Sequence, residues 1–344
     1  MRLLFVVRAG KREWIFPQKL GILWKESKNK GDPNHMIAFR DPVLEDRAWV
    51  EQGFRASGSR GCEYSFATLF LWSRRYRQQV AALDGYVLER LQGDRGAGYL
   101  FPAGEGPLEP ALSALEADAA ERGEPFRLFC VTPEQLERLE AVRPGVYSWQ
   151  ADRDGFDYLY DAGRLAGLSG KKLHGKRNHI NAFLADHTDW RVEEITEDNL
   201  SACVAMDAAW NRLYWQREGV DASEAGQIRD EERAMARAFA NYRALGLYGL
   251  LLRAEGEVVA FTMGSLIQED TLDVHFEKAF PQVRGAYPLI NREFVRWICA
   301  RLPAVRWINR EDDLGLEGLR RAKESYDPDQ MVEKYVVTRR EPVE

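Results

Sequence analysis

Five basic or titratable side chains fall within seven consecutive positions near the middle of the chain. They are Lys171, Lys172, His174, Lys176 and Arg177. At helical spacing Lys172 and Lys176 share one face, as do His174 and Arg177. Such a cluster can clamp the phosphates of a nucleic acid, a nucleotide or a lipid headgroup, with the arginine offering a two-pronged contact. The alternative is a solvated helix face, which is what most runs of charge are.

A second candidate site is the stretch 271–300, which predicts a strand, a glycine-containing loop and a helix. Thr271–Glu277 is rich in strand-forming residues, and apolar residues recur at helical spacing from about Pro288 to Arg301. A helix N-terminus after such a loop presents backbone N–H groups and the positive end of the helix dipole to an anion. We therefore predict that a phosphate-bearing donor binds here. A strand-loop-helix unit that binds nothing is the alternative.

The composition narrows the class of protein. A length of 344 residues suggests two domains, and 45% hydrophobic with 30% charged residues is ordinary for a globular chain. The net charge of −6 argues against a surface coated for nucleic acid, while leaving room for a local basic patch. No apolar run approaches the length of a membrane span, and the start lacks a signal-peptide cleavage site. We therefore expect a cytoplasmic protein.

The four cysteines are scattered through apolar contexts, and no pair of them has metal-ligand spacing. They are Cys62, Cys130, Cys203 and Cys299. Buried free thiols in a reducing compartment are the expected state. The sequence predicts neither a bound metal nor a tightly bound cofactor.

Helices and strands are expected to alternate in both halves of the chain. In the first half, Thr132-Pro133 opens a helix with a capping residue and a proline at its first turn. Strands are expected there at Gln79–Leu91, Gly98–Phe101, Phe126–Val131, Val146–Gln150 and Asp157–Asp161. The second half predicts a long helix at Leu165–Asp186, a hairpin at Leu247–Gln268, a short helix at Gly315–Ser325 and a last strand at Met331–Thr338.

This pattern predicts an α/β protein with a mixed sheet flanked by helices in each half. Residues 1–35 are unlike the rest and predict an N-terminal extension or an ordinary hairpin. The first domain is expected at residues 36–162 and the second at residues 163–340.

The second half of the chain resembles the C-terminal domain of phosphatidylglycerol lysyltransferases. The matching stretches are GKKLHGKRNHINAF from Gly170, HFEKAF from His275, RGAYPLINREF from Arg284 and NREDDLGLEGLRRAKESYDP from Asn309. EYSFATLFLW near residue 63 resembles the first half of those proteins, so the resemblance covers about Met36 to Thr338. It implies two tandem GNAT-like acyltransferase domains, an architecture shared with the Fem-type transferases that use aminoacyl-tRNA.

The resemblance implies transfer of an aminoacyl or acyl group from an activated donor to an amine or hydroxyl, by direct transfer. Aminoacyl-tRNA or acyl-CoA would be the donor, and a small molecule, a peptide or a lipid headgroup the acceptor. Lys176-Arg177-Asn178 resembles the basic helix start of Fem-type enzymes, which adds Asn178 to the expected donor site with Lys172. The alternative is a non-catalytic module on a transferase fold that binds a nucleotide, tRNA or lipid headgroup.

The glycine loop departs from the GNAT pattern for acyl-CoA, Gln/Arg-x-x-Gly-x-Gly/Ala. Arg284, Gly285, Ala286 and Tyr287 are expected to hold the donor, but the bulky Tyr287 stands where a second small residue belongs. A small residue there lets the backbone approach a pyrophosphate closely. The departure argues against coenzyme A and mildly favours charged tRNA.

Two residues are candidates for proton transfer. Glu277, just before the glycine loop, is the expected base for an incoming amine, and an ion pair with Lys278 or another cation is its alternative. Tyr326 lies where GNAT enzymes often keep a tyrosine acid, and a packed aromatic is its alternative. His275 shares the strand face of Glu277 and is either a proton relay or a hydrogen-bonded core histidine.

Polar residues at the end of the strand near residue 309 form the expected substrate site. Asn309, Glu311 and Asp312 are assigned to it together with His275. The carboxylates there can bind a substrate ammonium or a metal. Asp313 precedes Leu314-Gly315 and is more typical of a helix start.

Overall fold

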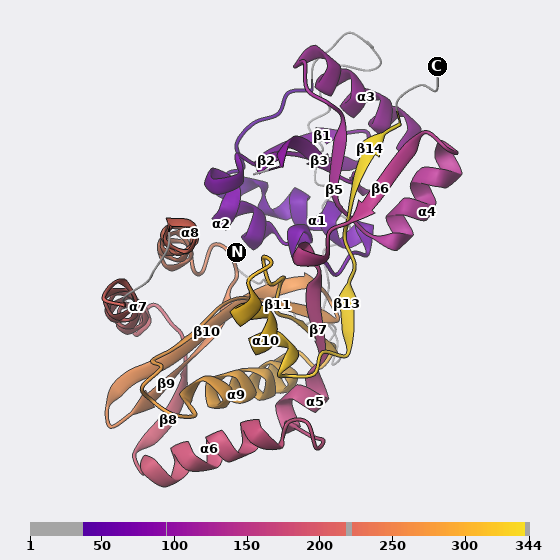
Figure 1. Ribbon diagram of the computed structural model, residues 1–344. Helices are drawn as coiled ribbons and strands as arrows, with labels where there is room; N and C mark the ends of the chain where they lie inside the picture. Colours follow the sequence, from indigo (N-terminus) through magenta and orange to yellow (C-terminus); the bar gives the residue numbers. More distant parts are fainter. Residues whose placement is uncertain (1–36, 94, 218–221, 341–344) are drawn as a thin grey trace, which may run out of the picture. The chain divides into compact units, whose positions relative to one another are not determined.

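The structure is a computed structural model that describes residues 37–93, 95–217 and 222–340. The predicted extension at residues 1–35 lies outside the described residues. The described residues form two mixed sheets flanked by helices (Figure 1), which confirms the predicted fold class. None of the described helices combines the length and the apolar character that crossing a bilayer requires.

The first sheet packs against two amphipathic helices. Its strands in spatial order are β1 (Gln79–Leu83), β2 (Tyr86–Gly93), β3 (Gly96–Leu100), β5 (Arg127–Val131), β14 (Tyr335–Arg339) and β6 (Tyr147–Ala151), and β4 (Ala103–Gly104) pairs with β2. The helices α3 (Leu108–Glu121) and α4 (Pro133–Val142) enclose a core that includes Leu112, Leu115 and Leu128. Thr132 caps α4 as predicted, because its hydroxyl and the Gln135 side chain bond each other's backbone N–H groups.

The second sheet is buried on both faces. Its strands in spatial order are β13 (Gln330–Val332), β7 (Asp157–Asp161), β12 (Trp307–Asn309), β11 (Thr271–Ala279), β10 (Glu257–Gln268), β9 (Tyr248–Ala254) and β8 (Trp190–Glu194). One face packs against α5 (Ala162–Gly167), α6 (His174–Asp186) and α9 (Ala286–Arg301). The other face packs against α7 (Leu200–Trp215), α8 (Ala222–Ala240), α1 (Arg47–Ser57) and α2 (Phe66–Tyr76). Since α1 and α2 come from the first half of the chain, the two halves share this apolar core.

The two sheets exchange strands, which corrects the predicted placement of two segments. Asp157–Asp161 was expected to complete the first unit, but it pairs with β12 and β13 in the second sheet. The predicted last strand is two strands: β13 stays in the second sheet, and β14 joins the first between β5 and β6 (Figure 1). Strand length and composition cannot reveal which sheet a strand joins. The predicted domain boundary near residue 162 stays a prediction.

The predicted long helix at Leu165–Asp186 is two helices, α5 and α6, separated by a turn. Leu168 and Gly170 in this turn have φ angles of 46° and 94°, which no α-helix tolerates. Lys171 and Lys172 therefore lie before α6 rather than on it. The expected helix face shared by Lys172 and Lys176 does not exist.

A wedge opens between β11 and β12. These parallel strands pair from Thr271↔Trp307 to Asp273↔Asn309, where their pairing ends. Beyond that point β11 continues to Ala279 alongside β10, whereas Glu311 has a φ of 56° and turns the chain away. The end of β11 and the segment after β12 can therefore border an open space at the centre of the sheet.

Gly285 joins the loop after β11 to α9, and we expect its replacement by alanine to destabilise the fold. Gly285 has a φ of 82°, and an added Cβ would lie 2.1 Å from the carbonyl oxygen of His179. In the Gly285→Ala variant we predict a loss of about 2–3 kcal/mol in the free energy of unfolding, measured by urea denaturation. The matched control is Gly175→Ala in α6, where an added Cβ meets nothing within 4 Å. Equal stability of the two variants would contradict the close approach.

Candidate functional site

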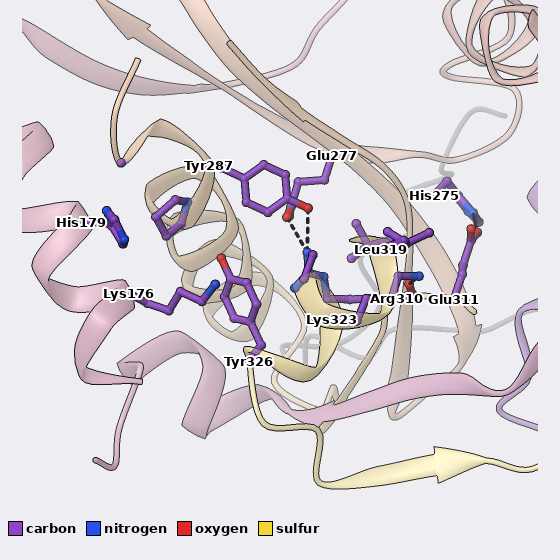
Figure 2. Close-up of a pocket in the computed structure, with 14 residues that line it drawn as sticks. Lys176, His179, His275, Glu277, Tyr287, Arg310, Glu311, Leu319, Lys323 and Tyr326 are labelled. Carbon is purple, nitrogen blue, oxygen red and sulfur yellow. Dashed lines mark hydrogen bonds and ion pairs between the residues drawn. The ribbon is translucent and has the colours of Figure 1, made fainter. Parts of the chain in front are cut away.

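A cavity of about 400 Å³ occupies the wedge between β11 and the segment that follows β12. Its wall combines residues of β11, the start of α9, α6 and the short helix α10 (Glu317–Glu324), as Figure 2 shows. The polar and titratable residues that line it are Lys176, His179, His275, Glu277, Tyr287, Arg310, Glu311, Lys323 and Tyr326. Cations and carboxylates thus border the same space, as a site for a charged or strongly polar ligand requires.

Arg310 bridges the wedge and is buried at its centre. Its Nη2 donates to Glu277 Oε1 at 2.9 Å and to the Tyr287 hydroxyl at 2.8 Å (Figure 2). The rings of Tyr326 and Tyr160 lie 4.7 and 5.7 Å from the guanidinium carbon. A carboxylate and aromatic faces together stabilise a guanidinium that burial would otherwise destabilise. Its Nη1 is buried and has no hydrogen-bond partner among the described residues.

Glu277 is held on two sides, and its side chain is almost fully buried. Oε1 accepts from Arg310, and Oε2 accepts from Asn291 Nδ2 of α9 at 3.0 Å. The alternative role, an ion pair with Lys278 or another cation, is met by Arg310. The Lys278 ammonium instead bonds Asp207 on the other side of the sheet. Both Glu277 oxygens therefore already accept hydrogen bonds.

Lys176 and Tyr326 form the opposite wall. The Lys176 ammonium lies 4.0 Å from the centre of the Tyr326 ring and donates to Ser325 Oγ at 2.7 Å. Burial, assisted by the positive charge of Arg310, lowers the pKa of Lys176 to about 8. Burial also raises the pKa of Tyr326 above its usual value, and its hydroxyl has no partner among the described residues. Lys176 is thus a cavity residue that changes charge near neutral pH.

Lys323 fixes the segment after β12. Its ammonium donates to the backbone carbonyls of Arg310 and Asp312, so α10 is tied to the strand that carries Arg310. Burial lowers the pKa of Lys323 and raises the pKa of Asp312 to about 7. The Asp312 side chain does not line the cavity.

A second cavity of about 660 Å³ adjoins the first. Both are lined by His179, Glu277, Gly285 and Tyr287, so the two cavities meet at Tyr287. The second is bordered by the loop 280–285 and by aromatic and basic residues of α7 and the turn after it. Its further lining residues include Trp210, Tyr214, Arg217 and Arg284. Trp210 and Tyr214 of α7 therefore reach this cavity.

The structure brings together half of the predicted site residues. Those that line the first cavity are Lys176, His275, Glu277, Gly285, Tyr287, Glu311 and Tyr326, and Arg284 lines the second. The roles assigned to these residues stay predictions. The close packing of Gly285 against α6 gives that glycine a structural reason independent of any anion.

The remaining predicted site residues lie outside both cavities. Arg177 donates to the carbonyls of Leu168 and Gly170, which closes the turn between α5 and α6. The buried Asn309 donates to Asp157 and to a backbone carbonyl. The others are Lys172, which pairs with Asp327, the exposed Asn178, the buried Ala286, and Asp312.

Sequence reasoning missed Arg310, Asn291 and Lys323. Arg310 stands between Asn309 and Glu311, both of which were assigned to the substrate site. The position of this arginine directly after a buried strand could have indicated a place in the site. Asn291 and Lys323 lie inside helices and gave no signal, because only tertiary packing turns them toward the wedge.

The two mixed sheets, the wedge and the loop leading into α9 belong to a fold that solved structures share. A family model described as phosphatidylglycerol lysyltransferase, C-terminal, matches residues 54–338. The chain therefore belongs to this family, as the sequence motifs indicated.

The chain is also similar to solved structures and to a curated sequence. A conserved protein of unknown function from Bacteroides thetaiotaomicron is 36% identical, with a TM-score of 0.81, over 89% of this chain and 100% of the other. L-PGS from Bacillus licheniformis shares the fold at 15% identity and a TM-score of 0.60, over 88% and 94% of the two chains. An uncharacterized protein from Mycoplasmoides gallisepticum is 23% identical over 188 residues, which span 53% of this chain and 55% of that relative.

We predict that Glu277→Gln destabilises the protein by about 3–5 kcal/mol, because it leaves the Arg310 charge buried beside a neutral amide. Urea denaturation measures the loss. The control is Glu317→Gln, which breaks an ion pair whose two side chains are 81% and 70% exposed and should change stability by less than about 0.5 kcal/mol. Adding Arg310→Met to Glu277→Gln should restore part of the loss. Additive losses in the double variant would show that the two residues do not interact.

Proposed function

We propose that this protein transfers an aminoacyl group, or a related acyl group, from an activated donor to an amine or hydroxyl by direct transfer in the first cavity. The observation that carries the proposal is the buried guanidinium of Arg310, which lines the cavity and keeps an unpartnered Nη1. Membership of a family named for lysyl transfer supports the reaction class.

Arg310 would stabilise the transition state. Attack on the carbonyl carbon of an aminoacyl ester places negative charge on the carbonyl oxygen. The Arg310 guanidinium is already fixed by Glu277 and Tyr287, so it needs no reorganisation when that charge develops. Low water content in the cavity strengthens the attraction between the guanidinium and the oxyanion. We therefore assign Arg310 to the oxyanion and Glu277 to the positioning of Arg310, in place of the base role expected for Glu277.

Lys176 and Tyr326 would carry the protons. The acceptor must lose a proton as its nitrogen or oxygen bonds to the carbonyl carbon, and the leaving oxygen must gain one as the ester bond breaks. A lysine of pKa about 8 is partly neutral at physiological pH and can take the first proton. The unpartnered Tyr326 hydroxyl can give the second and recover it from Lys176, whose ammonium lies over its ring.

The second cavity would hold the rest of the donor. Trp210, Tyr214 and Arg217 offer stacking faces and positive charge, which suit an unpaired nucleotide. Tyr287, where a coenzyme A loop keeps a small residue, supports a charged tRNA over acyl-CoA. A small molecule, a peptide and a lipid headgroup all stay open as carriers of the acceptor group.

A second candidate is a binding module that holds such a ligand without turnover. The engagement of both Glu277 oxygens favours it, because the carboxylate nearest the glycine loop is then not free to act as a base. Aminoacyl-tRNA or free tRNA bound tightly and recovered unchanged would be its signature.

The donor is tested by thermal shift of the full chain with acetyl-CoA, longer acyl-CoAs, aminoacyl-tRNA and free tRNA. A ligand at about a hundred times its dissociation constant stabilises by about 2.7 kcal/mol, which raises the melting temperature measurably. We expect a shift with aminoacyl-tRNA, followed by loss of its radiolabelled amino acid to an added amine acceptor. A shift with acyl-CoA alone would contradict the donor assignment, and binding without transfer would favour the second candidate.

The transfer rate should rise with pH through about 8, because Lys176 must be neutral to take a proton. We expect Lys176→Met to lower the rate by about a hundredfold or more and to flatten this pH profile. The pH profile of single-turnover transfer is the measurement.

Lys171→Met is the control, since Lys171 is exposed and lies in neither cavity. Donor affinity that falls through pH 8 while the rate does not rise would assign Lys176 to donor binding instead.

The lowered pKa of Lys176 also affects the stability of the protein. The unfolded chain binds more protons than the folded one between about pH 8 and 10.5, so this residue makes stability rise with pH in that window.

A further inference from the structure

Four side chains from three segments converge at the part of the first cavity away from Lys176. Asp273 and His275 project from β11, Glu311 follows β12, and Thr68 belongs to α2. Figure 2 shows His275 and Glu311 beside one another and separated from Lys176 and Tyr326. The ligand atoms of Asp273, His275 and Glu311 all lie within 4.8 Å of one another.

The distances in this cluster are those between ligands of one ion. His275 Nδ1 lies 3.4 Å from Asp273 Oδ2 and 3.4 Å from Glu311 Oε1. Thr68 Oγ1 lies 3.3 Å from the same Asp273 oxygen and 3.5 Å from Nδ1. Charge-assisted hydrogen bonds are shorter, at about 2.7–2.9 Å. Ligands about 2.1 Å from a tetrahedral zinc ion are about 3.4 Å apart, which matches all four distances.

The Asp273 carboxylate is compensated for its burial on one oxygen only, since Oδ2 accepts a hydrogen bond from Thr68 Oγ1. The residue is 0% exposed, and its Oδ1 has no hydrogen-bond partner among the described residues. A buried carboxylate in that state is costly unless a cation neutralises it. Within the described part of the chain, His275 is the one cationic side chain within ion-pair distance of Asp273 or Glu311.

A neighbouring cluster shows how this fold neutralises buried carboxylates elsewhere. Cys62, Glu63 and Asp157 also gather potential ligand atoms. There the Lys334 ammonium bonds Glu63 and lies 2.6 Å from Asp157 Oδ1, so the chain supplies its own cation. In the described ranges no lysine lies within ion-pair distance of Asp273 or Glu311. The two clusters can therefore be compared directly.

His275 is oriented as a metal ligand would be. Its Nε2 lies 2.8 Å from Ser265 Oγ, and this hydrogen bond fixes the ring with Nδ1 toward the two carboxylates. Ligating histidines in proteins are commonly held through their second nitrogen in this way. The competing arrangement is a protonated imidazole between two carboxylates, at distances longer than such pairs prefer.

We propose that Asp273, His275 and Glu311 bind a divalent transition-metal ion, with zinc the ion that the distances favour and the Thr68 hydroxyl near its fourth position. One imidazole and two carboxylates are ligands that zinc accepts, whereas calcium and magnesium favour oxygen alone. Glu311 and His275 line the cavity, which gives the ion a path of entry. The proposal does not depend on the transfer reaction.

The test uses the full chain without an affinity tag, stripped with a chelator and titrated with Zn²⁺ against a chromophoric competitor. We expect one ion per chain and a rise in melting temperature. Cobalt in place of zinc should give the strong visible absorption of a four-coordinate ion without a thiolate charge-transfer band. Asp273→Asn and Glu311→Gln, which keep side-chain shape, should each weaken the affinity by at least about tenfold.

Cys62→Ser is the matched control and should leave zinc affinity unchanged, because Lys334 already occupies that cluster. Absence of zinc binding, or a cobalt thiolate band, would overturn the proposal. So would a zinc affinity in both carboxylate variants that equals the affinity of the unsubstituted chain. If Asp273→Asn does not fold, Glu311→Gln decides the matter, since the Glu311 side chain is 23% exposed and its loss is better tolerated.

Discussion

The candidate site depends on the ion pair between Arg310 and Glu277. Parallel pairing of β11 and β12 stops after Asp273. Beyond that point the two chain segments no longer bond each other through their backbones, so other groups must bridge them. The guanidinium spans this opening and ties the segment after β12 to β11 and, through Tyr287, to the start of α9. A charge so deep in the protein is tolerable because its partner carboxylate is itself held by Asn291. The same pair leaves Arg310 Nη1 without a partner among the described residues.

The two ends of the first cavity have opposite electrostatic character. Lys176 and Arg310 make one end positive, and burial lowers the pKa of the Lys176 ammonium to about 8. Asp273 and Glu311 make the other end negative, and His275 lies between them. A polar ligand with an electron-rich carbonyl and a positive group, such as an aminoacyl ester, is complementary to this separation. The separation arises because Asp273 of β11 and Glu311 after β12 both lie beside His275, whereas Lys176 comes from α6.

Strand exchange makes the two halves of the chain one structural unit. β7 leaves the first half to pair in the second sheet, and β14 returns from the second half to the centre of the first. The buried Lys334, between β13 and β14, bonds Glu63 and Asp157 and so joins the crossing segment to two parts of the first half. The helices α1 and α2 also pack on the second sheet, which places Thr68 beside Asp273. Residues of the first half thus contribute to a site carried by the second.

The sequence by itself determined the elements and the family. Helix caps such as Thr132, the alternation of strands and helices, and motifs such as the one from His275 are local signals, readable because adjacent residues carry them. Tertiary structure alone decided which strand joins which sheet, because hydrogen bonds between distant segments leave no mark in composition. It also decided that Arg177 closes a turn while Arg310 lines the cavity. Both are arginines in basic or polar stretches, and only the partners that folding brings to them distinguish a structural cation from one open to a ligand.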